Sequence, residues 1–321
     1  MYIDRLSFAI HHSPFTITAM LSQLAEIFFN VITPVFALVL IGYFAGPRLG
    51  LDARTLSRYP YFILIPAFVF DVISRTKIEA NLAFRMMTFA VVVHIACACL
   101  GAAVAWAFGR SPKMIAAYVL VATFGNVGNF GLPIIEFHLG PDSIGIATVY
   151  FLAIMVISFI ICVAAANIQT GGSIGAVLAV LKTPALIAMV PAVLVSYFNL
   201  TPPVMVSRIT GLLGTAMVPT MLVALGVQLA QMERLNIDLD VILSSGVRLL
   251  GGASLALLLV GFFGLDGIER GAGIFQSAMP AAVLTSIIAL EYDLLPDFVT
   301  KSVLFSTLAS VITLTLLLAI V

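Results

Sequence analysis

The residues most capable of chemistry lie in one stretch, "TFGNVGNFGLPII" (residues 123–135), which sits inside a long apolar run. Asn126 and Asn129 are three positions apart, so on a helical turn they share a face and present two carboxamides that both donate and accept hydrogen bonds. Pro133 has no N–H and interrupts the helical ladder. Three glycines lower the cost of leaving helical dihedrals: Gly125, Gly128 and Gly131. The stretch therefore predicts a broken helix that carries a polar site.

A second stretch of the same kind, "GIFQSAMPAAVLTS" (residues 273–286), places Gln276 and Ser277 just before Pro280. Free N–H groups at the start of a half-helix attract anions, whereas free carbonyls at the end of one attract cations or donors. We expect the two broken helices to cross and to direct amides and helix ends at one small anion. The predicted substrate-binding residues are Asn126, Asn129, Gln276 and Ser277, and the predicted crossover residues are Gly125, Gly128, Gly131, Pro133 and Pro280.

The composition is that of an integral membrane protein of the all-α class. Of the 321 residues, 62% are hydrophobic and only 9% are charged, and the mean hydropathy is +1.17, far above that of soluble domains. A formal net charge of zero offers no basic face for nucleic acid. The three cysteines, at positions 97, 99 and 162, lie inside apolar runs, where we interpret them as reduced core residues. No cofactor and no metal is expected.

Ten apolar windows are long enough to approach the roughly 20 residues that a membrane span needs. Their approximate limits are 26–45, 58–73, 86–108, 114–139, 144–168, 183–200, 210–231, 242–264, 270–291 and 297–320. The predicted organisation is an N-terminal tail (1–25), a first five-helix repeat (26–168), a central loop (169–182) and a second five-helix repeat (183–321). The tail is interpreted as interfacial; alternatively, translation begins at Met20.

Prolines recur in the same order in the two halves. Pro34, Pro66 and Pro133 interrupt the first, second and fourth spans; Pro191, Pro219 and Pro280 interrupt the sixth, seventh and ninth at nearly the same spacing. Because each half has an odd number of spans, the second half enters the membrane from the opposite side. Inverted repeats with interrupted helices are typical of secondary transporters, which bind substrate near the bilayer midplane. Basic loop residues favour both termini outside the cytoplasmic (inner) membrane of the cell.

Few ionisable residues fall inside the predicted spans. His94 is nearest to mid-membrane and Glu136 follows Pro133, so both are candidate coupling residues; a histidine that hydrogen-bonds a neighbouring helix is the alternative. Asp71 and Arg75 are interpreted as interfacial, and Arg248 is placed at the cytoplasmic end of the eighth span. With no lysine or arginine expected at the centre of any span, a bound anion would depend on amides and helix dipoles. Those favour a monovalent or small dicarboxylate anion over phosphate.

The segments "FGNVGNFGLPI" and "AMVPTMLVALGVQL", together with Pro280 in the ninth span, resemble the auxin efflux carrier family, which includes bacterial malonate-type carriers and plant PIN proteins. The resemblance extends from about residue 26 to the end of the chain. It implies a ten-helix fold like that of bile-acid symporters and sodium–proton antiporters. Spans one, two, six and seven would form a scaffold through which the protein forms a homodimer, and the other six would form a moving unit.

The resemblance also assigns residues: Asn126, Asn129, Pro133 and Pro280 match the family's crossover. Plant members have a charged pair in the third span, and this chain has none between Met86 and Phe108. The expected function is transport of small organic anions by alternating access. A channel or sodium-coupled symporter of the same fold is the alternative. An intramembrane enzyme using Cys97 with His94 is less favoured, and so is a ligand-sensing receptor, because there is no room for a soluble signalling domain.

Overall fold

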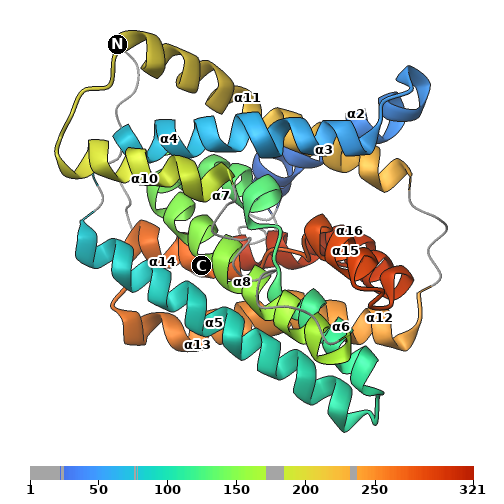
Figure 1. The fold of residues 1–321 in the computed structure, drawn as a ribbon. Helices are drawn as coiled ribbons and strands as arrows, with labels where there is room; N and C mark the ends of the chain where they lie inside the picture. Colours follow the sequence, from blue (N-terminus) through green and yellow to red (C-terminus); the bar gives the residue numbers. More distant parts are fainter. Residues whose placement is uncertain (1–21, 23–24, 76, 78, 171–183, 232–236) are drawn as a thin grey trace.

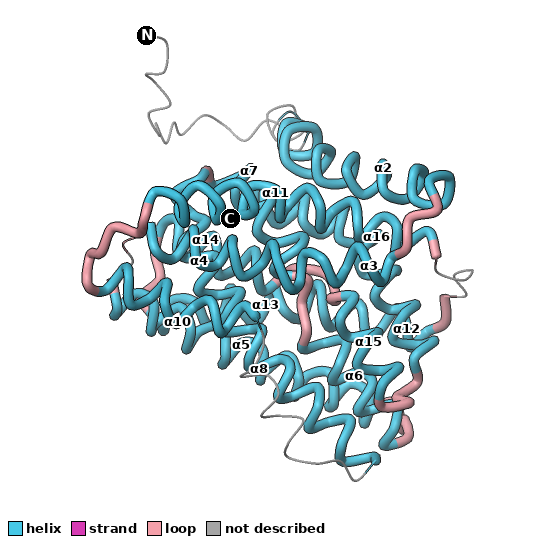
Figure 2. The backbone as a smooth tube through the Cα atoms, turned by 45° about the horizontal axis from the view of Figure 1, so that its top comes forward, coloured by secondary structure: helices cyan, strands magenta, loops and turns pink. Residues whose placement is uncertain are grey.

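The computed structural model describes residues 22, 25–75, 77, 79–170, 184–231 and 237–321. The predicted N-terminal tail and central loop fall almost entirely outside these residues. The described chain is helical throughout, with short loops between helices (Figure 2). Among the described residues the only strand-like pairing is one isolated antiparallel bridge, between Gly125 and Ala281. The predicted all-α class is therefore confirmed.

The first half of the chain contains the following elements: η1 (Phe28–Ile32), α2 (Thr33–Leu49), α3 (Ala53–Tyr59), η2 (Pro60–Leu64), α4 (Ile65–Arg75), α5 (Ala80–Ala107), α6 (Pro112–Thr123), η3 (Val127–Gly131), α7 (Leu132–Leu139), η4 (Pro141–Ser143) and α8 (Ile144–Thr170). The second half contains α10 (Pro184–Tyr197), α11 (Val204–Ala230), α12 (Leu239–Gly246), η6 (Val247–Gly251), α13 (Gly252–Leu259), η7 (Val260–Phe263), α14 (Gly267–Ser277), α15 (Val283–Glu291) and α16 (Pro296–Ile320).

Six of the described helical segments are individually long and apolar enough to cross a membrane: Ala25–Leu49, Ala80–Ala107, Pro141–Ala166, Val204–Ala230, Leu239–Phe263 and Pro296–Ile320. The remaining predicted spans correspond to shorter helices. Two of them are divided into half-helices, α6 with α7 and α14 with α15. A divided helix cannot present one long apolar window, so this test of length and composition finds six spans. The count of ten remains a prediction.

The helices pack in two groups. We call the first the panel; it comprises α2, α3, α4, α10 and α11, and its closest packing is between α2 and α11 and between α4 and α10. The second, the bundle, comprises α5 to α8 and α12 to α16. Figure 1 shows α2, α4, α10 and α11 in the upper half of the view and α5, α13 and α14 in the lower half.

The panel depends on two glycines where α2 crosses α11. A Cβ atom on Gly42 would lie 2.0 Å from the carbonyl oxygen of Val223, and one on Gly226 would lie 1.9 Å from that of Val39. Small residues of this kind let two membrane helices approach until their backbones touch. The α2–α11 contact is therefore a backbone-to-backbone contact that other residues would push apart.

The prolines that recur in the sequence are accommodated differently in the two halves. In the first half each follows a π-helical turn by two residues: Pro34 follows η1, Pro66 follows η2 and Pro133 follows η3. In such a turn the hydrogen bond runs over five residues instead of four, as between the Leu132 N–H and the Val127 carbonyl. The wider turn makes room for a ring that would otherwise clash with the carbonyl four residues earlier.

In the second half, Pro191 and Pro219 lie inside the α-helices α10 and α11, and Pro280 lies in the gap between α14 and α15. The π-helical turn of this half, η6, contains no proline. The two halves therefore share the order of their prolines but not the local backbone around them.

Candidate functional site

The two interrupted helices meet, as their sequences lead us to expect. The chain is extended between α6 and η3 and again between α14 and α15, and these extended segments pair antiparallel. The N–H of Asn126 donates to the carbonyl of Pro280 (2.7 Å), and the N–H of Ala282 donates to the carbonyl of Phe124 (2.8 Å). The pairing satisfies backbone groups that the helix breaks would otherwise leave exposed to hydrocarbon.

The position of the break differs from the one expected around Pro133. The helix is interrupted at Phe124–Asn126 and resumes as η3, so Pro133 already lies in the following half-helix, next to the N-terminus of α7. The helix is therefore interrupted in the glycine-rich segment before Pro133, and the π-helical turn η3 accommodates the proline ring without ending the helix. In the ninth predicted span, by contrast, Pro280 lies within the break.

A cavity of about 270 Å³ opens between the panel and the bundle at this crossover. The bundle contributes Gly125, Asn126, Gly128 and Asn129, four of the predicted residues. The remaining lining residues are Arg58, Tyr61, Ile65, Phe124, Val127, Phe151, Met155, Met221, Ala224, Gln228, Ala282, Val283 and Leu284. We call this space the first cavity. Its wall is mainly apolar with a few polar groups, which is the usual composition of a small-molecule site.

Asn126 supplies an unsatisfied polar group at the first cavity. Its side chain is 4% exposed, and its Nδ2 is buried without a hydrogen-bond partner among the described residues. A buried donor without a partner costs about 1–3 kcal/mol. Asn126 lines the cavity, so this carboxamide lies next to the space that a ligand would occupy. Asn129 is half-buried in the same wall.

The other predicted binding residues lie behind the crossover, inside the bundle. Gln276 is fully buried, and its Nε2 donates to the carbonyl of Ala147 (3.3 Å). The hydroxyl of Ser277 donates to the carbonyl of Gly273 (2.7 Å) and lies 2.7 Å from the Tyr150 hydroxyl. Neither residue lines the first cavity.

Two of the predicted crossover residues, Gly131 and Pro280, likewise contribute backbone rather than cavity wall. A Cβ on Gly131 would lie 2.1 Å from Gln276 Oε1, so the glycine leaves room for this glutamine. The carbonyl of Pro280 is used in the backbone pairing with Asn126. Both residues are fully enclosed in the bundle.

His94 lies within the bundle, where it contacts a neighbouring helix. Its Nδ1 lies 3.0 Å from the carbonyl of Ala90 and 3.3 Å from the hydroxyl of Tyr150 on α8. The side chain is fully buried and borders neither the first cavity nor the second cavity described next. The structure therefore places it in the hydrogen-bonded position that was the alternative to a coupling role.

A second cavity, of about 670 Å³, lies between the same two groups of helices, and Glu136 lines it. The other lining residues are Phe68, Asp71, Val72, Arg75, Lys77, Pro141, Asp142, Ile144, Gly145, Gly214, Thr215 and Val218. Along α4 the first cavity ends at Ile65 and the second begins at Phe68; along α11 the change occurs between Met221 and Val218. At a rise of 1.5 Å per residue, these shifts correspond to about one helical turn.

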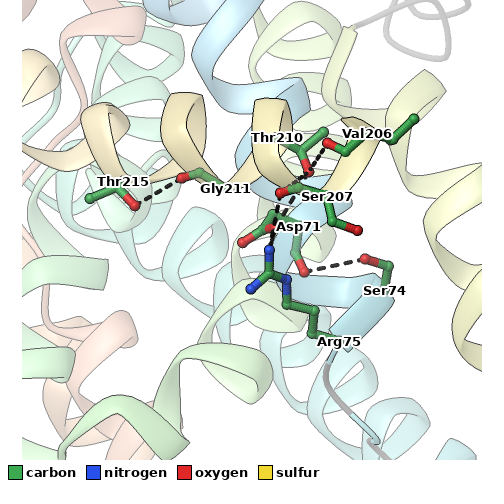
Figure 3. Close-up of polar contacts among 8 residues, drawn as sticks. All are labelled: Asp71, Ser74, Arg75, Val206, Ser207, Thr210, Gly211 and Thr215. Atoms are coloured by element: carbon green, nitrogen blue, oxygen red, sulfur yellow. Dashed lines mark hydrogen bonds and ion pairs between the residues drawn. The ribbon is translucent and has the colours of Figure 1, made fainter. Parts of the chain in front are cut away.

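The wall of the second cavity carries an ion pair within α4, and both of its members also contact α11. Arg75 lies 2.6 Å from Asp71 one turn earlier on α4 and also donates to the carbonyl of Ser207 on α11 (3.1 Å). The hydroxyl of Thr210 reaches Asp71 at 3.4 Å. Figure 3 shows these contacts between α4 and α11. The Arg75 side chain is 59% exposed.

Arg248 corrects one expectation from the sequence, since it does not lie at the end of a span. Helix α12 begins at Leu239, three residues earlier than expected, so Arg248 lies more than two turns into this helical segment, in η6. Its side chain is fully buried. One Nη donates to the carbonyls of Ala122 (2.8 Å) and Thr123 (3.3 Å), and the other donates to the carbonyl of Ser277.

One signal of this arrangement is present in the sequence. In "SSGVRLLGGA" the arginine is surrounded by small and apolar residues, with no acidic neighbour and with two glycines just beyond it. A Cβ on Gly252 would lie 2.3 Å from the Ser277 carbonyl oxygen, so this glycine lets the end of α14 approach η6 and α13. Because Gly252 allows this close approach, the guanidinium of Arg248, one turn earlier, lies next to the end of α14 at the crossover.

Comparisons with known proteins place the chain in a family. A family model described as membrane transport protein matches it twice, over residues 27–172 and 173–318. An uncharacterized transporter of Methanothermobacter thermautotrophicus is 25% identical over 298 residues, which cover 89% of this chain and 96% of the relative. An uncharacterized transporter of Methanocaldococcus jannaschii is 23% identical over 304 residues, with the same shares covered.

The two matches together span nearly the whole chain, and both relatives are matched over almost their full length. The resemblance to the auxin efflux carriers is thereby confirmed. The long apolar helices of the chain are those of a protein that crosses the membrane more than once. The chain is a multi-pass member of the membrane transport protein family.

Proposed function

We propose that the protein is a secondary transporter of small organic anions, mainly carboxylates, that works by alternating access in the cytoplasmic membrane. The observation that supports this most directly is the pair of cavities at opposite ends of one panel–bundle interface. A carrier needs a site that faces each side in turn, and a substrate site near the midplane is typical of inverted-repeat transporters.

The bundle is the part that moves in this proposal. Polar contacts tie its helices to one another: Arg110 and the hydroxyl of Tyr118 each lie 2.8 Å from an oxygen of Asp240, and Lys113 lies 3.1 Å from Asp293. These contacts join the beginning of α6 to α12 and to the loop before α16. A group held together in this way moves as one body, as an elevator-type mechanism requires, while the panel stays fixed.

The first cavity is the substrate site. The described residues that line it include no carboxylate, and Arg58 lies at its edge. The N-terminal residues of η3 and α15, Val127 and Val283, contribute to its wall. Helix N-termini and carboxamide N–H groups bind anions, so this wall suits a carboxylate, with its organic part against Phe151 and Met155.

The distribution of basic residues along the sequence indicates which side of the membrane each cavity faces. If the termini lie outside, Arg58 is at the cytoplasmic end of the panel and the first cavity faces the cytoplasm. The second cavity, with Arg75 and Lys77, then faces the outside. The ten-span arrangement as two inverted repeats, and a homodimer formed through the panel, belong to the same proposal.

The alternatives carry different expectations. A channel would need one continuous passage, whereas the two cavities are distinct. An enzyme built on Cys97 and His94 would need substrate to reach them, and both are fully buried and border neither cavity. A sodium-coupled symporter of the same fold differs only in what drives transport.

The test is direct and uses the full-length protein in detergent and in proteoliposomes. A thermal-shift screen at millimolar concentration compares benzoate, hexanoate and malonate with their amides, because ligand at free concentration L stabilises the folded protein by RT ln(1 + L/Kd) and weak ligands therefore need a high concentration. Uptake of the labelled hit is then measured with imposed proton or sodium gradients and with empty vesicles as control. Saturable uptake of an unmodified carboxylate supports the proposal, and failure of every carboxylate to bind or to be transported overturns it.

A further inference from the structure

The buried guanidinium of Arg248 holds the ends of two helices. Ala122 and Thr123 are the last residues of α6, and Ser277 is the last residue of α14; all three carbonyls accept from Arg248. Within the described part of the chain, Arg248 makes no ion pair, and its Nε has no hydrogen-bond partner. A full positive charge is thus buried next to the crossover without an acidic side chain to balance it.

Helix dipoles supply the charge balance. The C-terminal end of a helix carries roughly half a negative charge and the N-terminal end roughly half a positive charge. The two C-terminal ends at the crossover, those of α6 and α14, together offset about one positive charge, which Arg248 provides. The two N-terminal ends, those of η3 and α15, remain uncompensated.

The helix N-termini at the crossover face the first cavity, whereas the helix C-termini face Arg248. Val127, Gly128 and Asn129 at the start of η3 line the first cavity, and so do Val283 and Leu284 at the start of α15. The guanidinium lies behind this wall: a Cβ on Gly125, which also lines the cavity, would be 3.5 Å from Arg248 Cζ. Arg248 therefore acts on the cavity through the helix ends and through its nearby charge rather than by touching a ligand.

We infer that Arg248 determines the charge selectivity of the first cavity: by neutralising the ends of α6 and α14, it leaves a site that favours one monovalent anion. Without this charge the four helix ends would cancel and the cavity would not distinguish a carboxylate from its amide. The unsatisfied Nδ2 of Asn126 in the same wall is an independent sign that a ligand acceptor is missing there. The inference rests on the proposed function of the first cavity and names its substrate class.

The experiment compares dissociation constants for benzoate and benzamide, and for hexanoate and adipate, in the purified full-length protein. For the wild type we expect benzoate to bind about tenfold or more tightly than benzamide, because a fixed charge at low dielectric favours the anion. Hexanoate should bind more tightly than the dianion adipate, since the helix ends and Arg248 together leave one uncompensated positive charge at the crossover, and Arg58, the cation among the described lining residues, belongs to the panel rather than to the crossover. Arg248→Gln should bring the benzoate and benzamide constants within about threefold of each other, whereas Arg248→Lys should keep most of the preference.

Arg85→Gln is the matched control. Arg85 also donates to a backbone carbonyl, that of Gly264, but it borders neither cavity. The Arg85→Gln variant should therefore prefer benzoate over benzamide as strongly as the wild type does. A purely structural Arg248 would lower the melting temperature of the Arg248→Gln variant and leave its preference for benzoate unchanged, which would overturn the inference. If Arg248→Gln does not fold, the Lys variant and the wild-type hexanoate–adipate comparison decide: loss of preference in the folded Lys variant, or equal binding of the dianion, refutes it.

Failure of the inference is distinguishable from failure of the proposed function. A wild-type protein that binds none of the four probes contradicts the proposed substrate site and removes the inference with it. A wild-type protein that binds benzoate and benzamide equally well keeps its binding site but refutes the role of Arg248.

Discussion

The N–H of Asn126 donates to the carbonyl of Pro280 at 2.7 Å, which joins the two broken helices at their centres. The same residue lines the first cavity, and its side-chain Nδ2 has no hydrogen-bond partner in the part of the chain that the structure describes. The backbone of Asn126 is therefore used by the fold, and the proposed function assigns its carboxamide to the ligand. This division makes the two roles separable by substitution, because a side-chain change preserves the backbone pairing.

We expect Asn126→Ala and Asn129→Ala to fold normally and to lose carboxylate affinity. Each removes a hydrogen bond to the ligand, worth roughly 1–3 kcal/mol, or about ten- to a hundredfold in Kd. Melting temperature and Kd for the best carboxylate of the screen, measured on the same preparations, check this. Unchanged Kd in both variants would exclude them from the site.

Gln276→Ala provides the contrast. The sequence grouped this glutamine with the asparagines, but its amide donates to the carbonyl of Ala147 inside the bundle and does not line the first cavity. We now expect the substitution to lower the melting temperature, because it removes that hydrogen bond and leaves a space. The affinity of the folded fraction should be close to that of the wild type, and a large loss of affinity at unchanged stability would return Gln276 to the site.

The contact between α2 and α11 predicts sensitivity at Gly42 and Gly226. Gly42→Ala and Gly226→Ala should each destabilise the panel by about 1–3 kcal/mol, because the added methyl group overlaps a backbone carbonyl and forces the helices apart. Gly246→Ala is the matched control, since a Cβ there meets nothing within 4 Å. Melting temperatures of the three variants in one detergent decide, and equal values would contradict the close approach.

Much of this architecture was predictable from composition and sequence pattern. The apolar content predicted helices in a membrane, and the glycines and asparagines of residues 123–135 predicted a break, because such residues in an apolar run need a polar partner. The exact position of the break was not predictable. The prolines marked it less precisely than the glycines did, since a π-helical turn accommodates Pro133 without ending the helix.

The partners of buried polar side chains were harder to predict. Whether Arg248 reaches water or turns inward depends on which helix ends lie beside it, and that depends on contacts between residues far apart in the sequence, such as Ser277 and Gly252. Gln276 and His94 illustrate the same limit: the sequence indicates that a polar residue is buried but not which side of the crossover it faces, and their roles in binding and coupling remain predictions.

The ion pair at the wall of the second cavity leads to a kinetic prediction. Arg75→Gln should change the melting temperature little, because Arg75 is 59% exposed and surface ion pairs contribute about 0–1 kcal/mol. It should raise KM for anion entry from the side of the second cavity, because it removes a positive charge from that entrance. Lys113→Gln, which breaks the pair with Asp293 away from both cavities, should leave KM unchanged, and equal effects of the two variants would exclude a role for this entrance.

Movement of the bundle against the panel is tested by cross-linking. In a variant whose native cysteines are replaced, Phe68→Cys on α4 and Gly145→Cys on α8 place one thiol in each group, both on the wall of the second cavity. A short thiol-specific cross-linker should stop transport, because the interface can no longer slide, while carboxylate binding at the first cavity persists. The control pairs the same Phe68→Cys with Val218→Cys on α11, which joins two helices of the panel. Cross-linking within the panel should leave transport intact. Full transport after quantitative cross-linking of panel to bundle would show that the two groups do not move relative to each other at this interface, and the elevator-type mechanism would then be wrong.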